Sequence, residues 1–114
     1  MEIVTWILQG LLGLAFLMAG LGKLTGSKMH REGFDHWRLP QWFRVVTGIV
    51  ELVAAILLIV GFWVDDLALY GALILAATGI GGVLTHMRVK DGLKETMPIM
   101  VLAILAIILV FLLV

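Results

Sequence analysis

Four long runs of apolar residues alternate with short polar stretches along the chain. The runs lie at about 3–24, 42–62, 67–87 and 97–114, and each is close to the roughly 20 residues that cross a bilayer as a helix. A polar stretch at about 27–39 has the amphipathic pattern of a short helix on a membrane surface. The pattern predicts an all-α membrane protein: one domain over residues 1–114, built as a compact four-transmembrane-helix bundle with an amphipathic helix in the first loop.

The second run contains a carboxylate near its middle. It reads WFRVVTGIVELVAAILLIVGF, with Glu51 between apolar neighbours. A charged side chain at the bilayer centre costs at least about 2.5–3.5 kcal/mol, so Glu51 is expected to point into the bundle, either protonated or paired. Arg44, Thr47 and Gly48 share its helical face. Two interpretations stay open: a structural group that holds helices together, or a group that binds a ligand, a proton or a partner.

Small and polar residues recur at helical spacing on the first and third runs. One face of the first run carries Gln9, Gly13, Phe16, Gly20 and Lys23. One face of the third run carries Gly71, Thr78, Gly82 and Thr85. Glycines at helix interfaces let two backbones approach closely. We therefore predict helix packing at Gly13, Gly20, Gly48, Gly71 and Gly82.

Aligning the runs by their polar ends places several side chains around Glu51. Lys23, Arg44 and His86 lie at similar depth and are expected to reach toward the carboxylate. Thr78 lies at its depth and is expected to hydrogen-bond it, whereas Gln9 lies beyond. The predicted pocket for a ligand or partner therefore consists of Glu51, Lys23, Thr47, Thr78, His86, Arg44 and Gln9.

Composition indicates a membrane protein and limits the partners and metal or redox sites that can be expected. Hydrophobic residues make up 62% of the chain and charged residues 14%, against about 25% charged in a soluble domain. The net charge of zero gives no reason to expect a nucleic-acid partner. The absence of cysteine excludes disulfides, thiol redox relays and thiolate metal sites. His30 and His36 are expected to face solvent without a third ligand, so we predict no metal site and no catalytic residue.

The basic residues predict an orientation. All eight Lys and Arg lie in or at the edges of the first and third loops, whereas the second loop carries Asp65 and Asp66. The positive-inside tendency then places both basic loops in the cytoplasm and both termini outside. The first run lacks a basic leader and a small-residue cleavage site, so we expect a retained span. The expected location is a bacterial inner membrane, with the lipid bilayer as the constant partner.

Three stretches of the chain resemble the DoxX-like family of membrane proteins. They are FLMAGLGKL (16–24), TGIVELVAAILLIVG (47–61) and LTHMRVKDGLKETMP (84–98). The matching positions are Gly20, Lys23, Gly48, Glu51 and His86. The resemblance implies a compact four-helix membrane protein. Its name-giving branch is associated with thiosulfate:quinone oxidoreductase, and the animal chaperone of nicotinic acetylcholine receptors is similar, so the resemblance implies a quinone-linked or chaperone-like setting.

The function expected from these features is binding without autonomous catalysis. The ligand would be an apolar or quinone-like molecule, a lipid or a partner protein, held in a pocket centred on Glu51. Alternatives are an accessory subunit of a quinone-linked oxidoreductase partner, a membrane-protein assembly factor, and a proton-coupled transporter that would need to dimerise. Gly81, Gly82 or the wholly apolar fourth run could form a homodimer interface.

Overall fold

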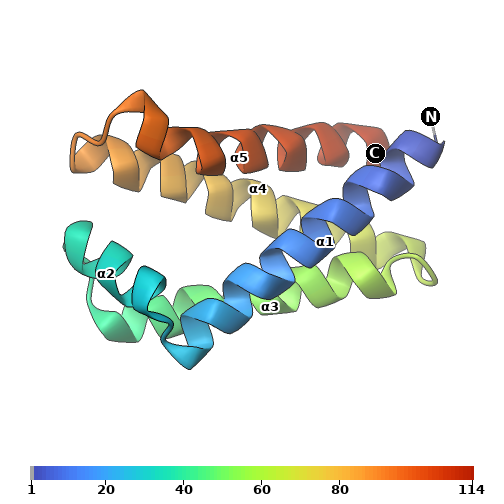
Figure 1. Cartoon of the computed structure of the whole chain (residues 1–114). Helices are drawn as coiled ribbons and strands as arrows, with labels where there is room; N and C mark the ends of the chain where they lie inside the picture. The colour runs from blue at the N-terminus through green and yellow to red at the C-terminus, as the bar shows by residue number, and fades with distance from the viewer. Residues whose placement is uncertain (1) are drawn as a thin grey trace.

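The structure, a computed structural model, describes residues 2–114, and these residues form five helices without strands (Figure 1). The helices are α1 (Glu2–Thr25), α2 (Lys28–His36), α3 (Gln41–Val60), α4 (Asp65–Arg88) and α5 (Leu93–Leu113). Four of them, α1, α3, α4 and α5, are long and apolar enough to cross a membrane. The predicted all-α class with four spans and a short helix in the first loop is therefore confirmed.

The fourth span begins earlier than its apolar run. We expected a start near residue 97 with Pro98 in the first turn, which is wrong because α5 begins at Leu93. Gly92 takes the position before the helix, and the side chain of Glu95 folds back toward it, as glutamates three residues into a helix often do. Pro98 consequently lies in the second turn, where its missing N–H leaves one backbone carbonyl without its helical partner.

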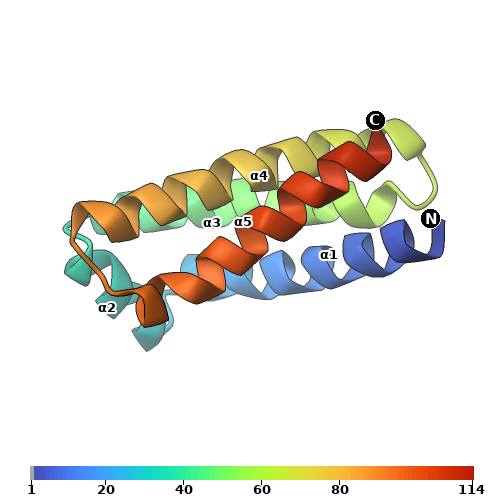
Figure 2. The same cartoon turned by 90° about the horizontal axis from the view of Figure 1, so that it is seen from above.

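The long helices form two antiparallel pairs (Figures 1 and 2). We call α1, α2 and α3 the N-terminal half, and α4 and α5 the C-terminal half. Both chain termini and the α3–α4 turn lie at one end of the molecule, the terminal end. The opposite end, where α2 and the α4–α5 turn lie, is the α2 end. In Figure 1 the two halves are close together at the terminal end and separate toward the α2 end.

Glycines set the close approach within each pair. A Cβ added to Gly20 would lie 2.9 Å from the carbonyl oxygen of Gly48, and one added to Gly79 would lie 2.8 Å from the Cβ of Ala103. Real Cβ atoms do not approach this closely, so these crossings need glycine. Four of the five glycines predicted to pack helices lie at contacts under 3.0 Å: Gly20, Gly48 and Gly82 within the pairs, and Gly71 between α4 and α3. Gly13 is less tightly placed, since its added Cβ would lie 3.3 Å from Cγ1 of Ile59.

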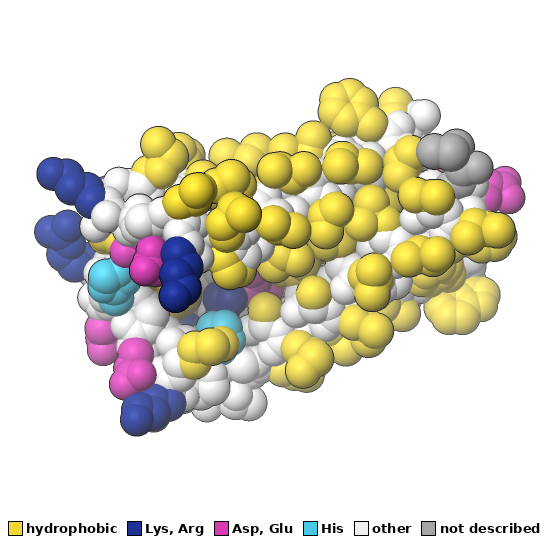
Figure 3. All heavy atoms as spheres, turned by 45° about the horizontal axis from the view of Figure 1, so that its top comes forward, with side chains coloured by type: hydrophobic (Ala, Val, Ile, Leu, Met, Phe, Trp, Pro, Cys, Tyr) yellow, Lys and Arg dark blue, Asp and Glu magenta, His cyan; other side chains and the backbone are white. Residues whose placement is uncertain are grey.

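The core lies toward the terminal end. Phe16, Leu12, Leu58, Leu75 and Leu109 are fully buried there, and small alanines of α3, α4 and α5 fill the spaces between them. The outward faces of all four long helices carry exposed Ile, Leu, Val and Phe side chains. Figure 3 shows these hydrophobic side chains along most of the length, with the charged ones gathered mainly at the α2 end. A bilayer would cover that apolar surface, as expected for an integral membrane protein.

Candidate functional site

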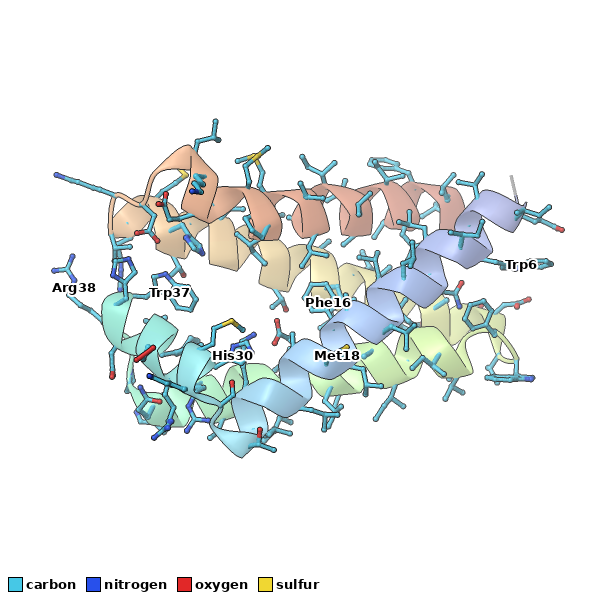
Figure 4. All side chains as sticks on the ribbon, viewed as in Figure 1. Trp6, Phe16, Met18, His30, Trp37 and Arg38 are labelled. Atoms are coloured by element: carbon cyan, nitrogen blue, oxygen red, sulfur yellow. The ribbon has the colours of Figure 1, made fainter. Side chains whose placement is uncertain are left out.

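A cavity of about 400 Å³ lies between the two halves toward the α2 end. Its walls come from all five helices, with α3 and α4 supplying most of them. Figure 3 shows a hollow in this part of the surface, with a basic and an acidic side chain visible below the rim. In Figure 4, Trp37 points from α2 into the space between the halves. Five of the seven residues predicted for the pocket line this cavity: Lys23, Thr47, Glu51, Thr78 and His86.

The cavity contains a buried ion pair. Nζ of Lys23 lies 2.8 Å from Oε1 of Glu51, and the two side chains are only 12% and 4% exposed. Glu51 is thus inside the bundle and paired, and the expectation that Lys23 reaches it is confirmed. Gly48 makes the meeting possible because a Cβ at this position would lie 2.9 Å from the Cβ of Lys23.

The Glu51 carboxylate is poorly supplied with hydrogen bonds. Its buried Oε1 faces the Lys23 ammonium at 2.8 Å, and no further donor among residues 2–114 bonds to it. Buried acceptors are normally satisfied, and an exception suggests strain, function or a missing partner. A donor supplied by a bound molecule would complete the surroundings of this ion pair.

Thr78 lines the cavity but does not bond Glu51. Its hydroxyl donates to the carbonyl of Ile74, with an oxygen–oxygen distance of 2.8 Å. The predicted hydrogen bond between Thr78 and Glu51 is therefore wrong, because a helical threonine satisfies its hydroxyl on the preceding turn of its own helix. Thr47 behaves in the same way, donating to Phe43 at 2.8 Å. The two threonines contribute polar surface to the wall while remaining internally satisfied.

Arg44 and Gln9 do not line the cavity. Arg44 donates to Gln41 at 2.7 Å and also to the backbone carbonyl of Lys23, so it caps the carboxyl end of α1. Gln9 is buried nearer the terminal end, where its amide donates to the carbonyl of Leu58 at 2.7 Å. Both placements correct the predicted pocket, because each side chain finds a backbone carbonyl before it could reach Glu51.

His30 is packed against α1. A Cβ on Gly22 would lie 2.8 Å from its imidazole ring, so the ring rests on the bare backbone of that glycine. The expectation that His30 faces solvent is wrong. The pKa of His30 lies below its ordinary value of 6.5, first because burial disfavours the charged ring and then because Lys23 and Arg44 are close. His36, by contrast, is 60% exposed, as expected.

Asp91, in the α4–α5 turn, was missed by the sequence analysis and lies close to three ring nitrogens. Oδ1 lies 2.6 Å from Nε2 of His36; Oδ2 lies 3.3 Å from Nε1 of Trp37 and 2.7 Å from Nδ1 of His86. The pKa of Asp91 is held below its ordinary value of 3.8, chiefly by the hydrogen bond from His36. We call Asp91, His36, Trp37 and His86 the Asp91 cluster.

The end of α4 explains how Asp91 is positioned. Lys90 has a left-handed backbone with φ of 60°, and the N–H of Asp91 donates to the carbonyl of His86 at 2.9 Å. This is the Schellman ending of a helix, in which a left-handed residue turns the chain back. Glycine usually takes that position, so a lysine there gives no clear sequence signal. The five-residue spacing from His86 to Asp91 becomes informative only once the turn is known.

The fold and the cavity define a membrane-spanning four-helix bundle with a polar site between its halves. The model of the DoxX-like family matches residues 7–108, so the chain belongs to that family. It is 25% identical over 100 residues to the uncharacterized protein YdgD of Bacillus subtilis (strain 168), which covers 87% of this chain and 88% of that protein. No solved structure matches the chain significantly.

Proposed function

We propose that the protein binds an amphipathic, mostly apolar molecule in the cavity, with its polar end at Lys23 and Glu51. The observation that carries the proposal is the buried ion pair inside an otherwise largely apolar space. A carbonyl or hydroxyl group of a ligand suits this pair, because Lys23 has ammonium protons to donate and Glu51 has no second donor beside that ammonium.

The size and walls of the cavity support a quinone-like ring or a lipid. Its volume of about 400 Å³ lies within the 300–1,000 Å³ common for small-molecule sites. Phe34, Trp37 and Phe43 supply aromatic surface on the side formed by α2 and α3. Flat rings pack favourably against such side chains in offset or edge-to-face geometry.

Ligand entry from the bilayer is also supported. Val46 and Val50 line the cavity and are 41% and 38% exposed. Gly81 of α4 lines the cavity too and has no heavy atom within 4 Å of the position of an added Cβ. The space therefore reaches the side of the bundle that lipid tails would cover, and a lipid-soluble molecule would not need to cross water.

The proposed role is binding without autonomous catalysis. An accessory subunit of a quinone-linked oxidoreductase would use the cavity to hold the quinone while a partner supplies the electrons. A membrane-protein assembly factor would use the same opening for a partner helix. The gathering of basic residues at the α2 end favours a cytoplasmic position for that end in a bacterial inner membrane.

Two measurements test the proposal. Mass spectrometry of the purified protein should find a co-purifying apolar compound that E51Q loses. Decylubiquinone added to protein in liposomes should quench the fluorescence of Trp37 saturably, in a variant with Trp6, Trp42 and Trp63 changed to Phe. We expect at least about tenfold weaker quenching affinity in E51Q, since one lost charged hydrogen bond is worth about 1.5–3 kcal/mol.

Controls separate binding from folding. Glu32→Gln makes the same chemical change on an exposed residue of α2 and should bind as the unmodified protein does. The double variant K23M/E51L removes the ion pair while keeping the volume apolar, so it should fold and still lose the polar recognition. Quenching that is equal in E51Q and Glu32→Gln, or that never saturates, would refute the site.

A further inference from the structure

The two halves are joined closely at the terminal end. At the α3–α4 turn, a Cβ on Gly61 would lie 2.7 Å from the Cβ of Ala68, and one on Gly71 would lie 2.8 Å from the carbonyl oxygen of Ala54. Backbones that approach this closely cannot slide apart without losing packing on both sides. The cavity lies between the halves farther along the bundle, at the levels of Glu51 and His86.

Polar contacts rejoin the halves beyond the cavity, at the α2 end. His36 and Trp37 of the N-terminal half both contact the Asp91 carboxylate of the C-terminal half. Arg88 adds a hydrogen bond from its guanidinium to the backbone carbonyl of Trp37. The Trp37 ring also packs edge-on against the ring of His86, with 5.1 Å between ring centroids.

Two members of the Asp91 cluster are also walls of the cavity. Trp37 and His86 line it, and both direct a ring nitrogen toward Asp91. A movement that frees Trp37 from Asp91 therefore also moves the aromatic surface that a ligand would touch. The same connection works in reverse, because a ligand that displaces Trp37 removes a donor from Asp91.

We propose that the Asp91 cluster is a latch that closes the cavity at the α2 end. When the latch is released, the two halves separate at that end, with the glycine contacts at the α3–α4 turn as the fixed side of the hinge. The role of the latch in ligand entry and exit rests on the proposed binding function, whereas the opening itself is a property of the bundle.

The chemistry of Asp91 suits a reversible closure. An ionised carboxylate is an acceptor on both oxygens, and here those oxygens accept from His36 and Trp37 and also lie 2.7 Å from Nδ1 of His86. His36 is mostly exposed, so water can replace one donor as the contact breaks. The contact between His36 and Asp91 therefore has a defined geometry and can still open toward water. Asparagine has a single acceptor oxygen, so the change to asparagine removes one of the two acceptor atoms that His36 and Trp37 use.

The absence of native cysteine makes the test direct. Spin labels on Glu32→Cys of α2 and Lys94→Cys of α5, both exposed positions, report the separation of the halves by pulsed electron resonance in lipid nanodiscs. We expect a narrow distance distribution in the otherwise unmodified protein. D91N should give a broader distribution with a population at longer distance, and Trp37→Phe should give a smaller change in the same direction.

Asp66→Asn is the matched control, because it makes the same change on an exposed aspartate at the terminal end. Its distance distribution should equal that of the unmodified protein. If D91N and Trp37→Phe also give the distance distribution of the unmodified protein, the latch is overturned. No ligand is present in this experiment, so the latch can stand even if decylubiquinone fails to bind. With decylubiquinone, D91N should speed association and dissociation at least threefold, and unchanged rates would overturn the role in entry.

Discussion

Lys23 and Glu51 meet inside the bundle because Gly48, one turn before Glu51, leaves room for the lysine side chain. The contact of 2.8 Å joins α1 to α3 beside the place where the two helices cross. At that crossing Gly20 of α1 packs directly against Gly48 of α3. Glycine, cation and carboxylate therefore act as one unit: the first sets the distance, and the other two offset each other's charge in an apolar environment.

Removing one member of the ion pair should destabilise the protein strongly. E51Q or Lys23→Met alone leaves a buried group without its partner, and we expect a loss of about 3–5 kcal/mol in the free energy of unfolding. The double variant K23M/E51L should recover most of that loss, because no unpaired charge remains. Unfolding by sodium dodecyl sulfate in mixed micelles measures these differences. Losses that simply add in the double variant would contradict the pairing.

A methyl group at Gly48 should separate α1 from α3. The added Cβ would lie 2.9 Å from the Cβ of Lys23 and 3.0 Å from the carbonyl oxygen of Gly20. We expect Gly48→Ala to cost about 1–3 kcal/mol of stability through overpacking. Gly81→Ala is the control, because nothing lies within 4 Å of its added Cβ, and it should be neutral or stabilising by up to about 1 kcal/mol through helix propensity. Equal melting temperatures for the two variants would show that the crossing is not tight.

The latch should resist mild acid. The pKa of Asp91 is depressed below 3.8, so its stabilising contribution is present above that value and is lost only as the pH falls through the lower folded-state pKa. The spin-label distances should therefore stay constant from neutral pH down to the ordinary aspartate value and lengthen below it. Lengthening that is complete well above 3.8 would contradict this assignment.

His30 should make stability fall in mild acid. Its pKa is lowered, so folding favours the neutral ring; that contribution is present above 6.5 and is lost as the pH falls through the lower folded-state value. The charged ring would lie near Lys23 and Arg44. Replacing His30 with Gln should reduce the drop in melting temperature between neutral pH and about pH 5, relative to the unmodified protein. An identical drop in both proteins would exclude His30 as the source.

The sequence predicted the spans and placed Lys23 among the side chains expected to reach Glu51. Apolar runs of bilayer length leave few alternatives, because backbone polar groups in lipid need helical hydrogen bonds. A carboxylate in the middle of one span and a lysine on the inward face of another favour meeting inside the bundle, because each charge alone in the bilayer has a high free-energy cost. Spacing left Lys23, Arg44 and His86 as candidate partners and a protonated Glu51 as the alternative, and the structure pairs Glu51 with Lys23.

Spacing did not predict which partner a polar side chain chooses when a backbone carbonyl is nearer. Thr78 bonds to its own helix, Arg44 caps α1, and Gln9 bonds to α3. Helical register places residues at a depth and on a face, but it does not rank a neighbouring carbonyl against a carboxylate one helix away. For Thr78 the bond within its own helix requires no rearrangement of other helices. Arg44 and Gln9 instead bond to carbonyls of a neighbouring helix, and these partners depend on the helix crossing.

By itself, the order of apolar, small and charged residues determined an all-α membrane bundle with Glu51 turned inward. Only the tertiary structure decided that the halves separate around a cavity. The reason is that the close glycine contacts between α3 and α4, at Gly61 and Gly71, lie near the terminal end, whereas the cavity lies farther along the bundle. It alone also brought Asp91 to His36 and Trp37, which precede it by 55 and 54 residues. That meeting depends on the left-handed turn at Lys90 and on how two helix pairs lie against each other, and neither follows from a periodic pattern.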